Sequence, residues 1–338
     1  MRRRSLLLAA VPAGLATLAG CGDGKSDSSK AAPSPSPSAS ASASAPPPPK
    51  IVDGPLPAIT AGTKFDEKPT VAKGPGEPSK DLAVKTVIAG SGRTVAENDF
   101  IQANYLGQIW STAKVFDNSY DRKSPLVIQL AQGSIIDGWR YALAGRKTGS
   151  RVQIAVPPTW GYGTSGNAQA GIKGTDTLVF VIDLIDSFNS KSSAKGTEVP
   201  QTDAALPKVG TNTNGEAPSI TIPKTAPPKK LVSAYVLEGD GPELKADQAI
   251  LCQFKGVVWD SGKPFEQTYG SGRLSQFSLE QMQQVVKGLP QGLAGKKVGS
   301  RVMVVVPPDL AYGNNPPSGG PIKKGSTLVF SVDILAAM

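Results

Sequence analysis

The chain has 338 residues, of which 39% are hydrophobic and 19% charged, and this length suits about two domains. It contains no histidine, which excludes Ser-His-Asp and Cys-His catalysis and removes the commonest zinc ligand. Its 36 Lys and Arg against 27 Asp and Glu give a formal charge of +9, but these basic residues are scattered rather than clustered with aromatics, so a nucleic-acid partner is not expected.

The first 21 residues carry the pattern of a secretory signal followed by a lipidation site. Three arginines at 2–4 precede an apolar run at 6–19, which is shorter than the ~20 residues of a membrane-spanning helix. The run ends in Leu18-Ala19-Gly20-Cys21, which resembles the lipobox of bacterial lipoproteins. This resemblance implies a signal peptide over 1–20 and lipidation of Cys21, with the protein anchored to the outside of the cell membrane. A plain signal peptide with an incidental cysteine is the alternative, and the arginines leave the export route, Sec or twin-arginine, open.

Two segments have the composition of linkers. Residues 21–62 are rich in Ser, Ala and Pro, and such a composition buries too little apolar surface to offset the entropy lost on ordering. We therefore predict a disordered tether over 21–62. A second polar segment predicts a linker over 189–214, which leaves two folded domains at 63–188 and 215–338.

Within the first folded domain the hydrophobic pattern has mostly a period of two, which predicts strands at 83–88, 100–106, 126–130, 151–156 and 177–182. One helix is predicted over Ser134–Leu143, because Ile135, Trp139 and Leu143 then share a face. Many short strands with a single short helix indicate an α+β fold in which an antiparallel sheet wraps around the helix.

The second folded domain is a copy of the first. Residues 142–163 and 292–313 lie 150 positions apart, and 13 of these 22 positions are identical. Similarity at a domain-sized offset indicates duplication, since each unit is long enough to bury its own core. Cys252, the only cysteine after Cys21, is expected to be a small core residue of the second copy.

Two segments partly match nucleotide-binding motifs, but the residues around them do not fit those motifs. The segment Gly161–Gly166 satisfies G-x-G-x-x-G, but a loop follows it where the dinucleotide motif requires a helix. A P-loop around Gly295-Lys296 lacks both its first glycine and the following Ser or Thr. We therefore expect no nucleotide, no metal and no other cofactor.

Aromatic and aliphatic residues at the junctions of strands and loops carry the remaining signal. They lie in the segments ANYLG, VFDNS, GSIIDGW, VPPTWGYG and TLVF, in that order. Their order and spacing resemble FKBP-type peptidyl-prolyl isomerases over 81–188 and again over 231–338. The resemblance implies a tandem FKBP-type peptidyl-prolyl cis-trans isomerase that is a bacterial, actinobacterial-like lipoprotein. Each FKBP-like domain would then be an antiparallel sheet wrapped around one short helix.

The resemblance also implies a site in the first domain. Trp139 would form the floor of an apolar pocket, the backbone N–H of Ile136 and the hydroxyl of Tyr162 would bind substrate carbonyls, and Arg122 would pair with the carboxylate of Asp117. The implied catalytic set is Tyr105, Phe116, Asp117, Ile135, Ile136, Trp139, Tyr162, Ile172 and Phe180. Plain core packing is the alternative for the apolar members, above all for Phe180.

The second copy keeps the frame of this site but changes its chemistry. Leu289 stands where the first copy has Trp139, and Glu266 stands where it has Asp117. The corresponding pocket is Phe254, Phe265, Glu266, Val285, Val286, Leu289, Tyr312, Ile322 and Phe330, and Ser271 takes the place of Arg122. We predict that the first domain is catalytically competent and that the second is weaker or only holds peptides.

Isomerisation fits a chain without histidine. Rotation about a peptide bond meets a barrier of ~18 to 20 kcal/mol, and an apolar pocket that removes water from the X-Pro imide lowers it without proton transfer. The predicted function is therefore a peptidyl-prolyl cis-trans isomerase that assists the folding of exported proteins. The expected partners are unfolded or exported proteins containing X-Pro bonds, rapamycin-type macrolides, and the membrane through the lipid anchor, with the protein itself a monomer.

Two alternatives stay open at this point. The chain could be a non-enzymatic chaperone or scaffold lipoprotein that uses two proline-preferring grooves for avidity. It could also be a structural lipoprotein on a relic fold, which would show neither isomerisation nor macrolide binding.

Overall fold

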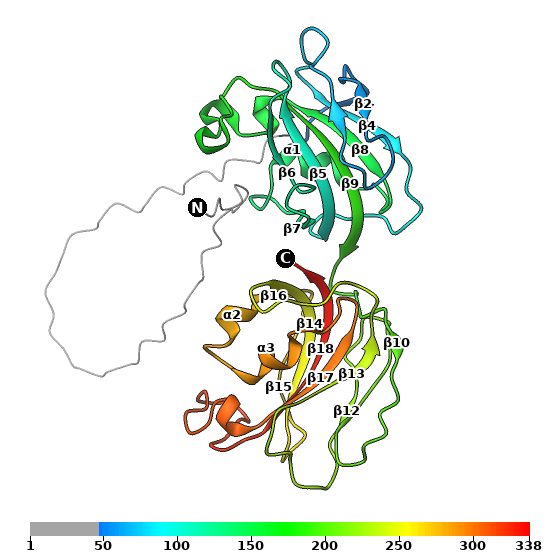
Figure 1. The fold of residues 1–338 in the computed structure, drawn as a ribbon. Coiled ribbons are helices and arrows are strands. Elements are labelled where there is room, and N and C mark those ends of the chain that lie inside the picture. The colour runs from blue at the N-terminus through cyan, green and yellow to red at the C-terminus, as the bar shows by residue number, and fades with distance from the viewer. Residues whose placement is uncertain (1–46) are drawn as a thin grey trace, which may run out of the picture.

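The computed structural model describes residues 47–338, which form two domains joined end to end (Figure 1). The predicted signal peptide, the lipidation site Cys21 and the tether up to residue 46 lie outside the described residues. Within 47–338, none of the helices combines the length and the apolar composition needed to span a membrane.

The first domain is built on one sheet with the strand order β1-β4-β8-β9-β5-β6, and β7 also pairs with β5. All pairs are antiparallel except β1 with β4. The strands are β1 Ile51–Val52, β4 Leu82–Ile88, β5 Phe100–Ile109, β6 Val115–Asn118, β7 Leu126–Gln129, β8 Arg151–Val156 and β9 Leu178–Phe188. The five predicted strands are therefore present, with β5 and β9 longer than expected.

One short helix, α1 Asp137–Leu143, packs on the concave face of this sheet. It begins three residues later than the pattern predicts. A Cβ added at Gly138 would lie 2.5 Å from Cγ1 of Val156, so the glycine permits a close contact between helix and sheet. Between β8 and β9 the chain makes three single-turn 3₁₀ helices, Pro158–Trp160, Gly163–Ser165 and Ala168–Ala170.

The second domain repeats this strand arrangement with the order β10-β13-β17-β18-β14-β15, and β16 pairs with β14; its edge strand β10 is antiparallel to β13, whereas β1 is parallel to β4. Its strands are β10 Thr197–Glu198, β13 Val232–Glu238, β14 Ala249–Val258, β15 Pro264–Gln267, β16 Ser275–Ser278, β17 Arg301–Val306 and β18 Leu328–Ala337. The α+β fold class is confirmed for both domains. The second domain has two short helices, α2 Leu279–Met282 and α3 Gly288–Leu293, where one was expected, and a 3₁₀ turn at Pro308–Leu310.

A strap of irregular chain covers the outer face of each sheet. We name residues 47–80 strap 1 and residues 195–230 strap 2; both lie to the right of the sheets in Figure 1. Strap 1 contains the hairpin β2 Ile59–Ala61 with β3 Thr70–Val71, and strap 2 the hairpin β11 Lys208–Val209 with β12 Ile220–Thr221. Their apolar residues bury one tryptophan of each sheet, Trp110 or Trp259.

The straps differ from the sequence-based expectation at both ends. Strands β1 and β2 lie within 21–62, which was predicted to be a disordered tether, and β10 and β11 lie within 189–214, which was predicted to be a linker. Strands of two or three residues are too short to show a periodic pattern. What orders these proline-rich segments is the sheet beneath them, through contacts that are distant in sequence.

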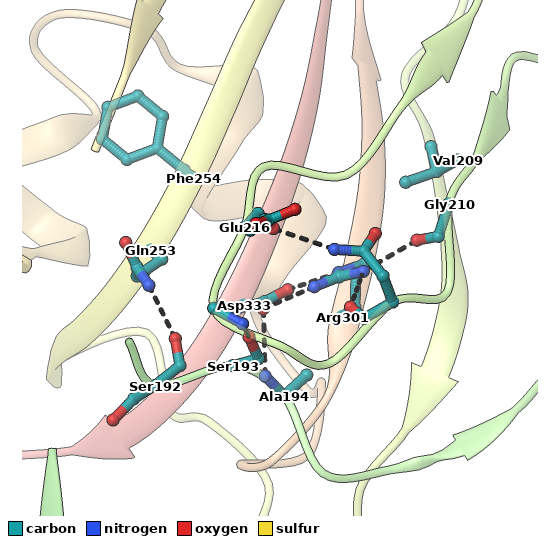
Figure 2. A network of polar contacts seen from close by, with 12 residues as sticks. Ser192, Ser193, Ala194, Val209, Gly210, Glu216, Gln253, Phe254, Arg301 and Asp333 are labelled. Carbon is teal, nitrogen blue, oxygen red and sulfur yellow. Dashed lines mark hydrogen bonds and ion pairs between the residues drawn. The ribbon is translucent and has the colours of Figure 1, made fainter. Parts of the chain in front are cut away.

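A fully buried ion pair lies under each strap. Arg151 and Asp183 are 2.6 Å apart with fully buried side chains, and Arg151 also donates to the carbonyl of Glu67 at 2.7 Å and to that of Gly62. Arg301 and Asp333 repeat the pair at 2.6 Å, and Figure 2 shows them from close by. Because every strap carbonyl that accepts from an arginine offsets part of the cost of burying its charge, pair and strap stabilise each other.

The two domains are docked through a separate apolar cluster, which we name the inter-domain cluster. Its buried members come from β7 and β9 of the first domain and from β14 and β18 of the second: Val127, Phe188, Leu251, Leu335 and Ala336. The connection is also held by hydrogen bonds, since Gln253 donates to the carbonyls of Ser190 and Ser192, the latter at 2.6 Å (Figure 2).

Candidate active site

The first domain encloses an apolar cavity between β5, β6, helix α1 and the loop after β8. Its lining contains eight of the nine site residues predicted from the sequence, together with two that were not predicted. The lining residues are Tyr105, Phe116, Asp117, Ile135, Ile136, Trp139, Tyr162, Asn167, Ala170 and Phe180. Ile172 does not line the cavity; it is buried in the core beside it.

Trp139 forms the floor of this cavity. Its side chain is 2% exposed, and its ring meets those of Tyr105 and Phe180 edge to face, with centroids 5.4 Å and 5.3 Å apart. Phe116 in turn meets Phe180 edge to face at 5.7 Å. Such perpendicular contacts fix ring orientations and leave little freedom for rearrangement. The floor and one wall are thus a rigid, preformed surface, and Phe180 belongs to the core and the cavity at once.

A polar network occupies one edge of the cavity. The hydroxyl of Tyr105 and the guanidinium of Arg122 both donate to the carboxylate of Asp117, and Arg122 also donates to the Tyr105 oxygen at 3.0 Å. Burial raises the pKa of Tyr105 well above its usual value, so the phenol stays protonated at neutral pH and keeps donating. The carboxylate is thereby held in one position at the rim of an apolar site.

Two further groups can donate hydrogen bonds to a bound molecule. Ile136 directly precedes helix α1, where the backbone N–H groups of the first turn lack intrahelical partners. Tyr162 lies in the loop between two 3₁₀ turns and is half-buried, and burial raises the pKa of its hydroxyl. At neutral pH this phenol is therefore a donor on the side of the cavity formed by the loop.

The two lining residues that were not predicted from the sequence, Asn167 and Ala170, lie in the loop that also carries Tyr162. Asn167 pairs with Ile172 through two backbone hydrogen bonds of 2.8 and 2.9 Å, and its side chain accepts from the N–H of Ala170 at 3.2 Å. This turn places Asn167 and Ala170 against the cavity. An asparagine that starts a turn beside glycines is the only sequence signal for it, and that signal indicates a turn rather than a site.

The corresponding region of the second domain keeps the frame. Phe265 meets Phe330 edge to face at 5.5 Å, as Phe116 meets Phe180. Leu289 is buried in the position of Trp139, and Val286 and Ile322 are buried nearby. Phe254 and Tyr312 are partly buried and pack against the same core cluster.

The polar edge is absent from this second region. Phe254 has no hydroxyl to donate, and Glu266 is exposed. The hydroxyl of Ser271 donates to the carbonyl of Thr268 at 2.6 Å and so does not reach a carboxylate. Val285, which corresponds to Ile135, is 53% exposed. The second region is therefore a more open apolar surface without the fixed carboxylate of the first.

The chemistry that the first cavity can perform is limited and specific. Within residues 47–338, no three His, Cys, Asp or Glu side chains are grouped so as to hold a metal ion. The cavity offers an apolar enclosure with a phenol at one rim and a fixed carboxylate at the other. It suits a compact apolar group attached to a polypeptide backbone, whose carbonyls can accept from the rim donors.

Comparison with known proteins shows one family match that recurs in both domains. A family model described as FKBP-type peptidyl-prolyl cis-trans isomerase matches residues 91–185 and 241–335. The FK506-binding protein of Streptomyces anulatus is 37% identical over 119 residues, which are 35% of this chain and 96% of that protein. The probable FK506-binding protein of Corynebacterium glutamicum is 33% identical over 122 residues, 36% of this chain and 99% of that protein.

A longer match includes more than one domain. The peptidyl-prolyl cis-trans isomerase FKBP9 of Mus musculus is 28% identical over 253 residues, which are 74% of this chain and 37% of that protein.

Proposed function

Since the chain belongs to the FKBP-type peptidyl-prolyl cis-trans isomerase family in both of its domains, we propose that its first domain supplies most of the isomerase activity. The observation that carries this proposal is the preformed aromatic floor of the first cavity, Trp139 held edge to face by Tyr105 and Phe180. The second domain, with Leu289 at that position, is proposed to bind peptides and to catalyse weakly.

The proposed mechanism begins with desolvation. The planar imide is stabilised by resonance that places negative charge on its oxygen, and water favours this polar form. When the proline ring enters the apolar cavity over Trp139, water is removed from the imide and the planar ground state loses that support. Proline suits the reaction because its cis and trans forms differ by only about 0.5 to 1 kcal/mol.

The rim donors then favour the twisted amide over the planar one. The hydroxyl of Tyr162 and the backbone N–H of Ile136 bind carbonyls of the peptide on either side of the rotating bond, and Asp117 faces the imide from the polar edge. Interactions that are better in the twisted state than in the ground state lower the barrier, and no proton has to be transferred. The absence of histidine from the sequence is compatible with this route.

The proposed cellular role rests on the signal pattern in residues 1–21 of the sequence. We propose that Cys21 is lipidated, that the chain acts as a monomer anchored outside the cytoplasm, and that it accelerates the folding of exported proteins. Uncatalysed X-Pro isomerisation takes tens to hundreds of seconds, long enough to limit folding. Members of the family bind proline-containing peptides and macrolides, and a rapamycin-type macrolide is proposed to compete with peptides for the first cavity.

A pair of matched variants of the full chain tests the asymmetry. Tyr162→Phe and Tyr312→Phe each remove one hydroxyl from corresponding loops, and isomerisation of a short X-Pro peptide is measured for both. We expect Tyr162→Phe to lower kcat/KM by roughly tenfold, the value of one hydrogen bond of about 1.4 kcal/mol, and Tyr312→Phe to lower it far less. Equal effects would reject the asymmetry, and a wild-type chain without activity would favour the non-enzymatic peptide holder.

A further inference from the structure

The two domains hold each other in a fixed arrangement, which sets where their peptide-facing sides point. The inter-domain cluster joins strand ends of both sheets. Arg93 of the first domain donates to the carbonyl of Ser187 at 3.0 Å and to the hydroxyl of Ser192, and Asn189 donates to Asp99 at 3.0 Å. Together with the bonds from Gln253, these contacts hold the connecting segment against both domains, so it is not a free hinge.

Both domains present the same side in the same direction. In Figure 1 the loop after β8 and helices α2 and α3 lie to the left of the sheets, and both straps lie to the right. Strands β7 and β16, which flank the helices, approach each other at the domain boundary (Figure 1). A polypeptide that leaves the first cavity can therefore continue towards the second along one side of the molecule.

A groove lies at that boundary. It has a volume of about 320 Å³ and is lined by both domains and the segment between them. The first domain contributes residues at the ends of β5 and β7, and the second contributes the turn before β16. The lining residues are Glu97, Asn98, Asp99, Phe100, Gln129, Asn189, Ser190, Gly272, Arg273 and Leu274. We name it the inter-domain groove.

Several polar groups of the groove are unused. Asn98 and Arg273 are exposed, and neither side chain has a hydrogen-bond partner among residues 47–338. Gln129 donates to the carbonyl of Asn98 at 3.1 Å, which leaves its own side-chain oxygen available. In contrast, Asp99 is 2% exposed and is satisfied by Arg93 and Asn189, and Glu97 pairs with Arg140 at 3.0 Å.

The free groups match a polypeptide backbone. A primary amide donates and accepts at once, as a peptide bond requires, and a guanidinium donates to carbonyls without needing a negative charge opposite it. A site for a free anion would be weakened by the two acidic residues in the same wall. Phe100 and Leu274 add apolar surface at the domain boundary.

We propose that the inter-domain groove binds the main chain of an extended client polypeptide, so that one client segment occupies the first cavity, the groove and the second domain together. This inference rests on the proposed function, because it takes both domains to bind peptides. It assigns Asn98 and Arg273 to main-chain recognition, and it makes the spacing between two proline sites in a client a determinant of affinity.

The test uses the full chain and synthetic peptides. One set carries a single Leu-Pro site; the other carries two such sites joined by Gly-Ser spacers of about 4, 8, 12 and 16 residues, a range of extended lengths set by ~3.4 Å per residue. Binding is measured by calorimetry for the wild type, Asn98→Gly, Arg273→Ala and Lys229→Ala. Glycine keeps the backbone of Asn98, whose φ is 68°, and Lys229 is an exposed lysine of strap 2 that controls for the loss of one positive charge.

We expect the affinity for two-site peptides to pass through a maximum with spacer length. At that maximum, Asn98→Gly and Arg273→Ala each lower the ratio of two-site to one-site affinity by about three- to tenfold, as expected for one lost hydrogen bond, while Lys229→Ala does not. Protection of the backbone amides of 97–100 and 189–190 from hydrogen exchange by the optimal peptide is the second readout.

Two results separate the failures. Affinity that does not depend on the spacer, or variants that behave like Lys229→Ala, would overturn the groove while single-site peptides are still isomerised. Single-site peptides that are neither bound nor isomerised would overturn the proposed function itself, and the groove with it.

Discussion

The two domains share their frame and differ at the peptide-facing side. Each has the same strand order, the same strap over its outer face and the same buried Arg-Asp pair at 2.6 Å. On the inner face, Trp139 in one domain corresponds to Leu289 in the other, and the edge network of Tyr105, Asp117 and Arg122 has no counterpart. The residues that form the sheet are thus different from the residues that form the site. A substitution in the first domain can therefore be compared with the matched substitution in the second.

The largest expected effect lies in the shared frame. Replacing Arg151 by Met leaves the buried Asp183 without its charged partner, and we expect a loss of about 3 to 5 kcal/mol in the free energy of unfolding of that domain. Arg301→Met should cost the second domain a similar amount. Denaturant unfolding followed by tryptophan fluorescence measures both, since Trp110 and Trp259 each lie under one strap.

A double variant is the control for this prediction. Arg151→Met combined with Asp183→Leu removes both charges and should recover most of the lost stability. If the losses in the free energy of unfolding of Arg151→Met and Arg301→Met differ by more than a few kcal/mol, the two buried ion pairs do not stabilise their domains equally.

The next effect concerns the floor of the first cavity. Trp139→Leu gives the first domain the residue of the second, and we expect kcat/KM for a short X-Pro peptide to fall by about 10- to 100-fold, because the proline ring loses its fixed support. Leu289→Ala in the second domain should change kcat/KM far less. Circular dichroism distinguishes this loss from unfolding, and a comparable fall in both variants would place equal activity in the two domains.

A smaller effect is expected at the polar edge. Asp117→Asn weakens the hydrogen bonds from Tyr105 and Arg122, and bonds to a charged group are worth about 1.5 to 3 kcal/mol, of which only a part acts on the rotating imide. We therefore expect kcat/KM to fall by roughly threefold to tenfold. Glu266→Gln is the matched change in the second domain, and its kcat/KM should stay close to that of the wild type in the same peptide assay.

The smallest effect at physiological pH comes from the buried phenols. Burial raises the pKa of Tyr105, Tyr120 and Tyr162 in the first domain, and of Tyr269 and Tyr312 in the second, above the ordinary value of 10.0. Because the folded state keeps these protons longer than the unfolded state does, their contribution to stability is complete below about pH 10 and is lost as the pH rises further.

Unfolding midpoints measured from pH 7 to 11 check this sign. Stability should be level with respect to these groups up to about pH 9 and should then decline, with the domain that holds three raised phenols declining more steeply. A decline that begins near pH 8 would contradict it.

Most of the sheet was predictable from the sequence, because its long strands alternate or run apolar over five or more residues. Strand β8 begins and ends where the pattern predicts it, and β9 extends to Phe188 because its last residues pair with β5, which no local pattern reports. Helix α2 had an overlooked signal: the Ser278 hydroxyl accepts from the N–H of Gln281, as an N-cap serine does.

The resemblance named eight of the residues that line the first cavity, whereas the short strands of the straps carry no periodic pattern in the sequence. Ile172 was expected to line the cavity but lies behind it. Its backbone pairs with that of Asn167, and this pairing places Asn167 at the cavity. Leu56-Pro57 and Leu206-Pro207, at the same offset of 150, are a weak trace of the straps in the sequence. Two such dipeptides do not rise above the proline content of the segments around them.

The position of the last strand in each domain has a consequence for how the chain is made. Strand β9 lies between β8 and β5, and β18 lies between β17 and β14, so each sheet is completed from its middle. Arg301 on β17 must meet carbonyls of Gly210 and Asn212, 91 and 89 residues earlier, before its charge is satisfied. Contacts this distant make folding slow, and they delay it until the whole domain has been synthesised. We therefore expect each sheet to lack its central strand, and to leave two strand edges unpaired, until β9 or β18 has been synthesised.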